Sequence, residues 1–413
     1  MAGPYKLTQG ALFLGVEDSW GAGSSSLFYV KAFNIEASDL GYGYEPGQDI
    51  TQQDVEDIGQ SIRQPATVGF EMGAHPVRST FPDAAPTDDL HPPAELAKAV
   101  LGKSIIDGYS SVEAGSLVSA LKVPEGESSE FSVGCCYWTR AGALDTGKVM
   151  MFRVKSITLS GGNPDTLNLL WDLPTAPVTN NAIYGSFNVY KGALSDSYNV
   201  RWEGLNPKDV RDFKGDQVES MSLAAPAGQL GNFKVSFRSA RCDDIDVAEA
   251  GGGPSVQSYP YPEKSQVLDG GLFLWNGSAL TKFTGGVDID FGVELTNDDG
   301  LHYDDPNGIA SMVTHKRDIR IKLTPAWDGN QQFEDFRDGD TVTVFGWWGI
   351  GSKVMGFNAP TGFQIKSPEP TNRNEFWALS QEFGVAAYSG DTGADDSVDN
   401  VFGLTWLAGD DAS

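Results

Sequence analysis

The stretches GALFLG (residues 10–15) and GGLFLW (residues 270–275) decide the fold, because each opens a similar series of strand patterns. The first leads to LFYVKAFNIEASD (residues 27–39), and the second leads to TKFTGGVDIDFGVE (residues 281–294). In both of these segments, apolar and polar residues alternate. Such a period of two residues predicts β-strands with one buried face and one polar face.

Two further landmarks follow in the same order in both halves of the chain. They pair residues 131–160 with 340–367, and residues 168–178 with 375–385. The first pair contains the aromatic runs GCCYW and FGWWG, each followed by a turn and a long apolar segment. Three matched landmarks in one order predict two divergent copies of one β-rich module.

The length and composition of the chain agree with two modules. Its 413 residues exceed the size at which a single hydrophobic core stops growing, and its 49 glycines and 22 prolines favour many turns. The segment around residues 246–266 is acidic, then glycine-rich, then rich in proline and tyrosine, which is typical of a linker. We therefore expect a first module over 1–245, a linker over 246–266 and a second module over 267–413.

The first copy is longer than the second by about 55 residues between the first two landmarks. This extra length holds HPPAELAKAVLGK (91–103), where prolines at the start and Gly102 near the end predict a helix. A weaker helix candidate lies at 308–315, and a strand-rich tail of the first copy spans 185–242. The expected fold is mainly β, with two tandem antiparallel barrel or sandwich modules, one short helix and a long insert in the first.

The net charge of −27 excludes a chain that grips nucleic acid, because such binding requires clustered lysine and arginine. Two interpretations of the acidic surface stay open, a salt-tolerant surface or a functional repulsion of phosphate. Three cysteines do not form a disulfide framework. We also expect no secretory leader, because residues 1–15 lack a sustained apolar segment. We expect no membrane anchor, since the longest aromatic-apolar run, VTVFGWWGIG (342–351), is too short to span a bilayer as a helix.

The sequence contains no recognisable catalytic, metal or phosphate motif. Its four histidines do not have the spacing of metal ligands. The acidic loops at 297–308 and 390–400 have a composition suited to calcium or to plain turns, and their spacing favours turns. Trp347 and Trp348 are adjacent, so at most one would serve as a sugar platform, and packing is expected. We predict a protein that is not an enzyme and that holds no metal or cofactor.

The layout of the chain resembles the tail-tube proteins of long-tailed bacteriophages that carry two tube modules per chain. The resemblance rests on PPAELAKAVLGK (92–103), on the strand and turn series within 198–239, and on GGVDIDFGVELTNDDGL with RDIRIKLTP within 285–325. It implies a β-barrel or sandwich module of the kind shared with the type VI secretion tube protein. Three such chains would close a pseudo-sixfold ring, and stacked rings would form a hollow tube that conducts DNA.

The resemblance also implies partners and a location. The chain would bind copies of itself and other tail proteins, namely the tail tip, the terminator and the tape measure, while DNA passes without being bound. It would belong to the virion tail and be assembled in the host cytoplasm. In that family the inner wall of the ring is a continuous sheet to which all modules contribute.

The polar faces of the predicted strands supply the candidate channel-lining residues Asn34, Glu36, Asp288, Asp290 and Glu294. Negative charge there would keep passing DNA from sticking to the wall. The alternative is that these side chains face bulk solvent on an ordinary antiparallel sheet. The tract 39–73 is interpreted as a loop that reaches a neighbouring ring.

A second function class stays open. The ten tryptophans and the acidic loops also suit a cell-surface or secreted β-sandwich protein that binds carbohydrate or mediates adhesion. The two classes predict different behaviour, because a tube protein forms rings and a sugar-binding module stays small.

Overall fold

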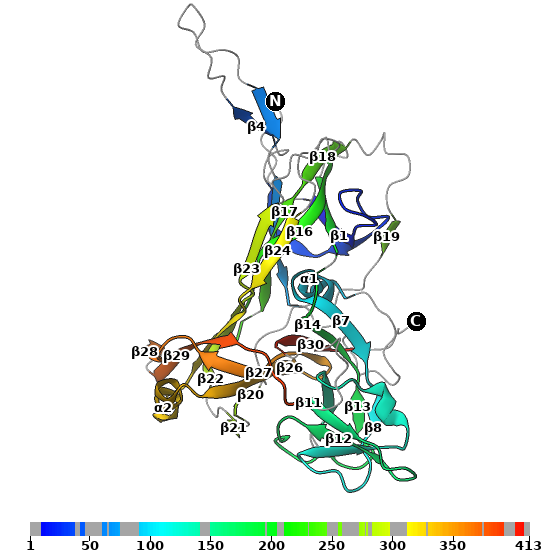
Figure 1. The fold of residues 1–413 in the computed structure, drawn as a ribbon, viewed down its shortest axis with the longest axis vertical. Coiled ribbons are helices and arrows are strands. Elements are labelled where there is room, and N and C mark those ends of the chain that lie inside the picture. The colour runs from blue at the N-terminus through cyan, green and yellow to red at the C-terminus, as the bar shows by residue number, and fades with distance from the viewer. Residues whose placement is uncertain are drawn as a thin grey trace, which may run out of the picture.

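The computed structural model describes residues 10–37, 42–45, 60–63, 66–74, 91–140, 149–194, 196–204, 210–229, 231–245, 255–257, 272–276, 278–279, 283–297, 312–327, 329–373, 376–391 and 401–408. Their fold is mainly β and built from antiparallel sheets, as predicted, and Figure 1 shows its elongated arrangement. No helix among the described residues is long and apolar enough to cross a membrane.

The first module is a sheet of seven antiparallel neighbours. Their order is β2 (Ser26–Val30), β1 (Gly10–Val16), β15 (Tyr198–Gly204), β16 (Val210–Ala225), β17 (Asn232–Ser239), β6 (Ala66–Gly73) and β3 (Ala32–Ala37). The strand β16 changes partner along its length, after Asp216, and its register with β17 then shifts between Val218 and Ser220. One half of it therefore pairs with β15 and the other half with β17.

The second module repeats this order strand for strand. The order is β21 (Ser278–Ala279), β20 (Leu272–Trp275), β26 (Thr341–Ile350), β27 (Lys353–Gln364), β29 (Phe376–Val385), β25 (Arg320–Pro325) and β22 (Phe283–Asp290). Two further strands also correspond, since β18 (Arg241–Ile245) pairs with β16 and β30 (Gly403–Leu407) pairs with β27. After β27 the chain continues as β28 (Glu369–Arg373), which forms a hairpin with β29.

The strands that correspond in the two modules differ from the pairs of segments matched in the sequence at the second and third landmarks. The counterparts of β26 and β27 in the strand order are β15 and β16, whereas residues 131–160 contribute to a separate six-stranded sheet. The strand-rich tail at 185–242 therefore completes the first module, and the separate sheet is the inserted part. The alignment paired the wrong hairpins because two fully buried hairpins share an apolar composition whichever sheet they join.

The inserted sheet, residues 110–184, is called the insert below. Its strand order is β8 (Ser110–Ser111), β13 (Ala182–Tyr184), β10 (Cys136–Arg140), β11 (Val149–Thr158), β12 (Asp165–Leu169) and β9 (Ala120–Val123), with the 3-10 helix η1 at Glu127–Glu130. The insert packs against the second module, at the lower right of Figure 1. Trp171 stacks on Phe345 of β26 with ring centroids 3.5 Å apart. Trp347 donates a hydrogen bond from Nε1 to the Val149 carbonyl oxygen over 3.1 Å.

A buried ion pair fixes the insert to the segment that follows β29. The Arg153 guanidinium donates from both terminal nitrogens to the two carboxylate oxygens of Asp391, at 2.9 and 2.7 Å. Both side chains are 1% exposed, and Arg153 also donates from Nε to the Gly134 carbonyl oxygen. A bidentate pair with its remaining donor satisfied is the geometry in which burial of two charges is tolerated.

Two α-helices lie among the described residues. The predicted helix is α1 (Pro92–Leu101), which begins with prolines and ends at Gly102 in the left-handed conformation, with φ 103°. A second helix, α2 (Gln331–Asp338), was not predicted, because only Phe333 and Phe336 mark its apolar face. The candidate at 308–315 is wrong where it is described, since its residues from 312 onward belong to the strand β24 (Met312–Arg317).

The remaining described strands connect these units. The strand β14 (Ser186–Lys191) pairs with β7 (Gly102–Asp107) on one side and with β30 of the second module on the other. The hairpins are β23 (Val293–Asn297) with β24, and β4 (Tyr42–Glu45) with β5 (Gln60–Arg63). Within the expected linker, β19 (Ser255–Gln257) pairs in parallel with β2. The tract 39–73, interpreted as a loop, thus contains a hairpin, which stands away from the rest in Figure 1, and the core strand β6.

The end of β7 carries a titratable group with a shifted pKa. Burial raises the pKa of the Asp107 carboxyl from about 3.8 to about 6, against the lowering effect of hydrogen bonds from Ser132 Oγ and Tyr137 OH. The folded chain therefore holds this proton more tightly than the unfolded chain. Its contribution to stability is complete below about pH 4 and is lost as the pH rises through 6.

We predict that Asp107→Asn removes this pH dependence. Wild type should lose about 2–3 kcal/mol from this group between pH 4 and pH 7, because one pKa unit corresponds to about 1.4 kcal/mol. The variant should lose correspondingly less, as measured by urea unfolding at several pH values. Parallel pH profiles for the two proteins would contradict the assignment.

Candidate functional site: the polar face of the joined sheet

The two modules share one continuous sheet. The half of β16 that pairs with β17 also pairs with β22 of the second module, in the antiparallel register Ser222 opposite Asp290 and Ala224 opposite Asp288. The result is an eight-stranded arrangement, here called the joined sheet. Its order is β3, β6, β17, β16, β22, β25, β29, β28, with four strands from each module.

Four of the five predicted residues lie on this sheet, and their side chains are exposed as the alternation predicts. Asn34 and Glu36 are in β3, while Asp288 and Asp290 are in β22. The residues between them, such as Ile35 and Ile289, are buried. Asn34 has a positive φ of 51° at a register shift in β3, and an asparagine tolerates this left-handed conformation better than most residues.

The joined sheet brings part of this set together around a hollow. A depression of about 500 Å³ is lined by Asn34, Glu36 and Asp290, although β3 and β22 are distant in sequence. The intervening strands β6, β17 and β16 supply the rest of its polar lining, which includes Glu71 and Lys234. The exposed and half-buried side chains on this side of the joined sheet are called the polar face below.

The charge on the polar face is mixed. Asp288 lies opposite Lys322, and Asp290 lies opposite Arg320, on the neighbouring strand β25. In the first module Glu71 lies opposite Lys234. Because directly opposed residues of antiparallel strands point to the same side, each of these carboxylates has a cationic neighbour.

Two further groups of opposite charges continue this pattern. Glu219 accepts a hydrogen bond from Arg238. Glu382 contacts Arg320 at 3.6 Å and Lys366 at 2.7 Å. Exposed pairs of this kind contribute little to stability, commonly below about 1 kcal/mol, so their main effect is on the charge that the face presents. The uniformly negative wall expected from the sequence is replaced by one in which opposite charges are interleaved.

Glu294 is not part of this set. It lies in β23, which pairs only with β24 among the described strands, and its closest cationic partner is Lys316 at 3.9 Å. The glycine at 292 has a positive φ of 52° and turns the chain between β22 and β23. The alternation in the sequence continues through this turn, which explains why Glu294 was grouped with the aspartates.

The cationic members of the polar face were missed by the sequence reasoning. Lys234 and Arg238 alternate with apolar residues in NFKVSFRS, and Arg320 and Lys322 do so in RIKLTP. These signals are as clear as that of VDID. Only the register of the sheet shows that they stand beside the carboxylates.

The hairpin β23–β24 completes the junction between the modules. Arg317, the last residue of β24, donates hydrogen bonds to the carbonyl oxygens of Val100 and Leu101 at the C-terminus of α1, and to that of Gly192. A cation at this helix end satisfies carbonyl groups that have no partner within the helix. The junction therefore combines strand pairing with a charged contact to a helix.

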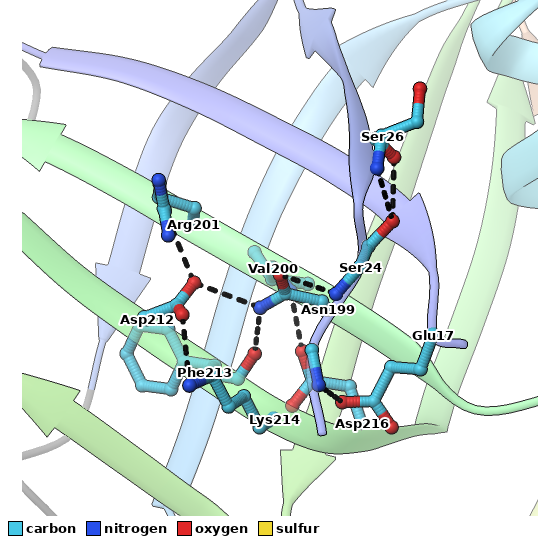
Figure 2. Close-up of polar contacts among 11 residues, drawn as sticks. Glu17, Ser24, Ser26, Asn199, Val200, Arg201, Asp212, Phe213, Lys214 and Asp216 are labelled. Carbon is cyan, nitrogen blue, oxygen red and sulfur yellow. Dashed lines mark hydrogen bonds and ion pairs between the residues drawn. The ribbon is translucent and has the colours of Figure 1, made fainter. Parts of the chain in front are cut away.

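A second polar cluster lies inside the first module and is shown in Figure 2. Glu17 accepts hydrogen bonds from the backbone N–H groups of Gly21, Gly23 and Gly215, and from Ser197 Oγ. These contacts hold the connection between β1 and β2 against β16. The carboxylate thus satisfies backbone donors of a turn that would otherwise be partly buried without partners.

Beside it, Asp212 accepts from Asn199 Nδ2 at 2.9 Å and forms ion pairs with Arg201 and Lys214 (Figure 2). Asp216 accepts from the Val200 N–H at 2.8 Å and is fully buried. Burial raises the pKa of the Asp216 carboxyl well above its ordinary value, and the charge of Glu17 raises it further. The interactions of this cluster are internal to the module and give it a structural role.

The acidic loops, the cysteines and the adjacent tryptophans singled out in the sequence lie outside the polar face. The acidic loops at 297–308 and 390–400 lie mostly outside the described residues, and within the described part no group of three or more acidic, histidine or cysteine side chains is arranged to hold a metal. Cys135, Cys136 and Cys242 are buried and form no disulfide with one another, and burial raises the pKa of the Cys136 thiol to about 12. Trp347 and Trp348 are both buried, so they pack rather than bind sugar.

Comparison of the sequence with protein-family descriptions and with curated proteins gives no significant match.

Proposed function

We propose that the chain is a tail-tube protein of a long-tailed bacteriophage, which assembles into rings that stack into a DNA-conducting tube. The observation that carries this proposal is the joined sheet, in which four strands of each module form one continuous surface with a polar side. A sheet that continues from module to module inside one chain is suited to continue from chain to chain in a closed ring. Closure would remove the two exposed edges, which otherwise invite aggregation.

The size of such a ring suits a conduit. Three chains would bring twenty-four strands, at eight strands from each. With strands about 4.8 Å apart and tilted by about 40°, a barrel of that number has a backbone diameter of about 45–50 Å. Side chains narrow this opening, and the remaining channel admits a DNA duplex.

The mixed charge of the polar face fits the passage of DNA. Clustered lysine and arginine would bind phosphate by releasing counterions, whereas here each named cation on the face stands beside a carboxylate. The wall then neither holds the duplex nor builds up the repulsion of a purely acidic surface. In this function DNA is a passing cargo, and the lasting partners are other copies of the chain.

The same proposal sets the remaining partners and the location. Rings at the two ends of the tube would contact tail-tip and terminator proteins, and the tape-measure protein would occupy the channel before DNA ejection. The chain would be assembled in the host cytoplasm and reside in the virion tail. Its closest rival is a carbohydrate-binding protein.

One observation favours that rival. Trp327 and Trp377 are exposed side by side, and exposed tryptophans bind sugar rings. Their ring planes are 88° apart, however, so the two do not form the flat platform on which a sugar chain stacks. We therefore rank this function second.

Electron microscopy of the purified chain over a concentration series, with its mass in solution, tests the proposal. Rings or tubes with a central hole, built from trimers, are expected. A monomer at every concentration together with binding to a glycan array would overturn the proposal in favour of the carbohydrate-binding function.

A single charge reversal on the polar face should make assembled particles hold DNA. In Asp288→Lys the carboxylate opposite Lys322 becomes a second cation, and the ring gains a cluster of adjacent positive charges. We expect retention of linear duplex DNA at low salt to rise at least tenfold and to disappear as salt is raised. Filter binding at several salt concentrations measures this.

The matched control is Glu294→Lys, which makes the same change of charge at an exposed carboxylate off the polar face. It should leave DNA retention at the wild-type level. Equal retention by the two variants would contradict the assignment of the polar face to the channel wall.

A further inference from the structure

The joined sheet ends in two strands that have one neighbour each among the described strands. At one end β3 pairs only with β6, and at the other end β28 pairs only with β29. Inside the sheet, the counterpart of β3 has two neighbours, because β22 pairs with β25 on one side and with β16 of the first module on the other. The second module thus uses an edge that the first module leaves open.

The opposite edge shows the same asymmetry. In the second module the counterpart of β16 is divided into β27 and β28. The half of β16 that forms a hairpin with β17 therefore corresponds to β28, which forms a hairpin with β29. In the first module this half-strand pairs with β22. In the second module β28 is the last strand, and its residues Glu369, Pro370 and Asn372 are exposed.

We propose that β28 of one copy pairs with β3 of a second copy, so that the junction inside the chain is repeated between chains, and that Trp327 and Trp377 are its main source of affinity. The inference rests on the proposed function for the closure of the ring. To that function it adds which two strands meet, that β28 of each copy contacts β3 of the next, and which residues stabilise the contact.

The aromatic residues lie next to the free edge. Trp377 stands opposite Asn372 of β28 and is 62% exposed. Trp327 meets it edge to face, with ring centroids 6.4 Å apart, and donates its backbone N–H to the Trp377 carbonyl oxygen over 3.0 Å. Trp327 also contacts Phe333 of α2, where Phe336 is 38% exposed. The patch therefore runs from β28 to the helix.

At its turn the internal junction has no tryptophan pair of this kind, and a reason follows from the chain itself. The turn between β16 and β17, residues 226–231, contains no aromatic residue. There the partners belong to one chain, so their association loses no translational freedom, and Arg317 adds charged hydrogen bonds to α1. Two separate copies lose that freedom on binding, and buried tryptophans are the residues that most often supply the required affinity.

Cysteine cross-linking in the full chain tests the strand pairing. Thr371→Cys in β28 is combined with Asn34→Cys or with Glu36→Cys in β3, since both β3 residues are exposed and the three natural cysteines are buried. At least one combination should give disulfide-linked dimers and trimers under oxidising conditions. Ser222→Cys with Asp290→Cys, directly opposed in the internal junction, is the positive control and should give a cross-link within one chain.

Tryptophan replacement tests the source of affinity. Trp377→Ala should weaken self-association at least 30-fold, as measured by sedimentation, and leave the melting temperature of the unassembled chain unchanged because the side chain is mostly exposed there. The matched control is Leu159→Ala, which removes an apolar side chain that is 74% exposed on the insert. The control should assemble as wild type does.

The outcomes separate this inference from the proposed function. Rings that form without any β28–β3 cross-link, and equally well in Trp377→Ala, would overturn the inference and keep the tube. A wild-type chain that neither assembles nor cross-links would overturn both. Loss of glycan binding in Trp377→Ala, in a chain that stays monomeric, would assign the tryptophans to carbohydrate.

Discussion

Replacing Asp391 by alanine is expected to lower the free energy of unfolding by about 3–5 kcal/mol, because the variant leaves the buried Arg153 guanidinium without its counter-charge. Both guanidinium nitrogens that now donate to the carboxylate would lose their acceptors in a site closed to water. The insert should loosen from the second module as a result. Urea unfolding measures the first effect, and limited proteolysis of the insert measures the second.

Two comparisons sharpen this prediction. The double variant Arg153→Met with Asp391→Leu removes both charges and should recover most of the loss, since well-packed apolar side chains often replace a buried ion pair at little cost. Lys366→Ala breaks an exposed pair with Glu382 of similar length and should cost less than about 1 kcal/mol. If Asp391→Ala cost no more than Lys366→Ala, the buried pair would not anchor the insert.

Replacing Trp171 by alanine should also destabilise the chain by about 3–5 kcal/mol, the usual effect of deleting a large buried aromatic side chain. Trp171 is 4% exposed, stacks on Phe345 and donates from Nε1 to the Met151 carbonyl oxygen over 3.2 Å. The substitution would leave a cavity where the insert meets the second module. Thermal unfolding, followed by tryptophan fluorescence and by calorimetry, measures the loss.

Trp377→Ala is the control for this second prediction. It removes the same side chain from a position that is 62% exposed, so its effect on unfolding of the unassembled chain should stay below about 1 kcal/mol. Equal destabilisation by the two substitutions would mean that the stack of Trp171 on Phe345 does not hold the insert in place.

The local features of the fold were predictable from the sequence. Alternation around Ile35 and Ile289 gave the correct strands and the exposed polar residues, but Phe33, expected on the apolar face, is 40% exposed at the register shift of β3. The prolines and Gly102 gave the limits of α1 to within a residue or two. The strand alternation and the helix limits depend only on residues a few positions apart in the sequence. Such local relations can be read directly from hydrophobic periodicity and from helix-capping residues.

The partners of the strands were not predictable in the same way. Nothing in the alternation of VDID indicates that it pairs with β16 rather than with a strand of its own module. The positions of Lys322 and Arg320 beside the aspartates depend on register, which is set by the whole sheet. For the same reason the hairpin of β10 and β11 was matched to β26 and β27, although the two hairpins lie in different sheets.

The pairing of β14 with β30 has a consequence for synthesis of the chain. Tyr190 meets Gly403, which leaves the ribosome about 210 residues later. At about 5–20 residues per second this delay is about 10–40 s. During that time β14 lacks its partner β30, and until β22 is made the second half of β16 also lacks its neighbour from the second module. Synthesis of β30 is therefore the event that completes this pairing, and a product truncated before β30 would present an open strand to its neighbours.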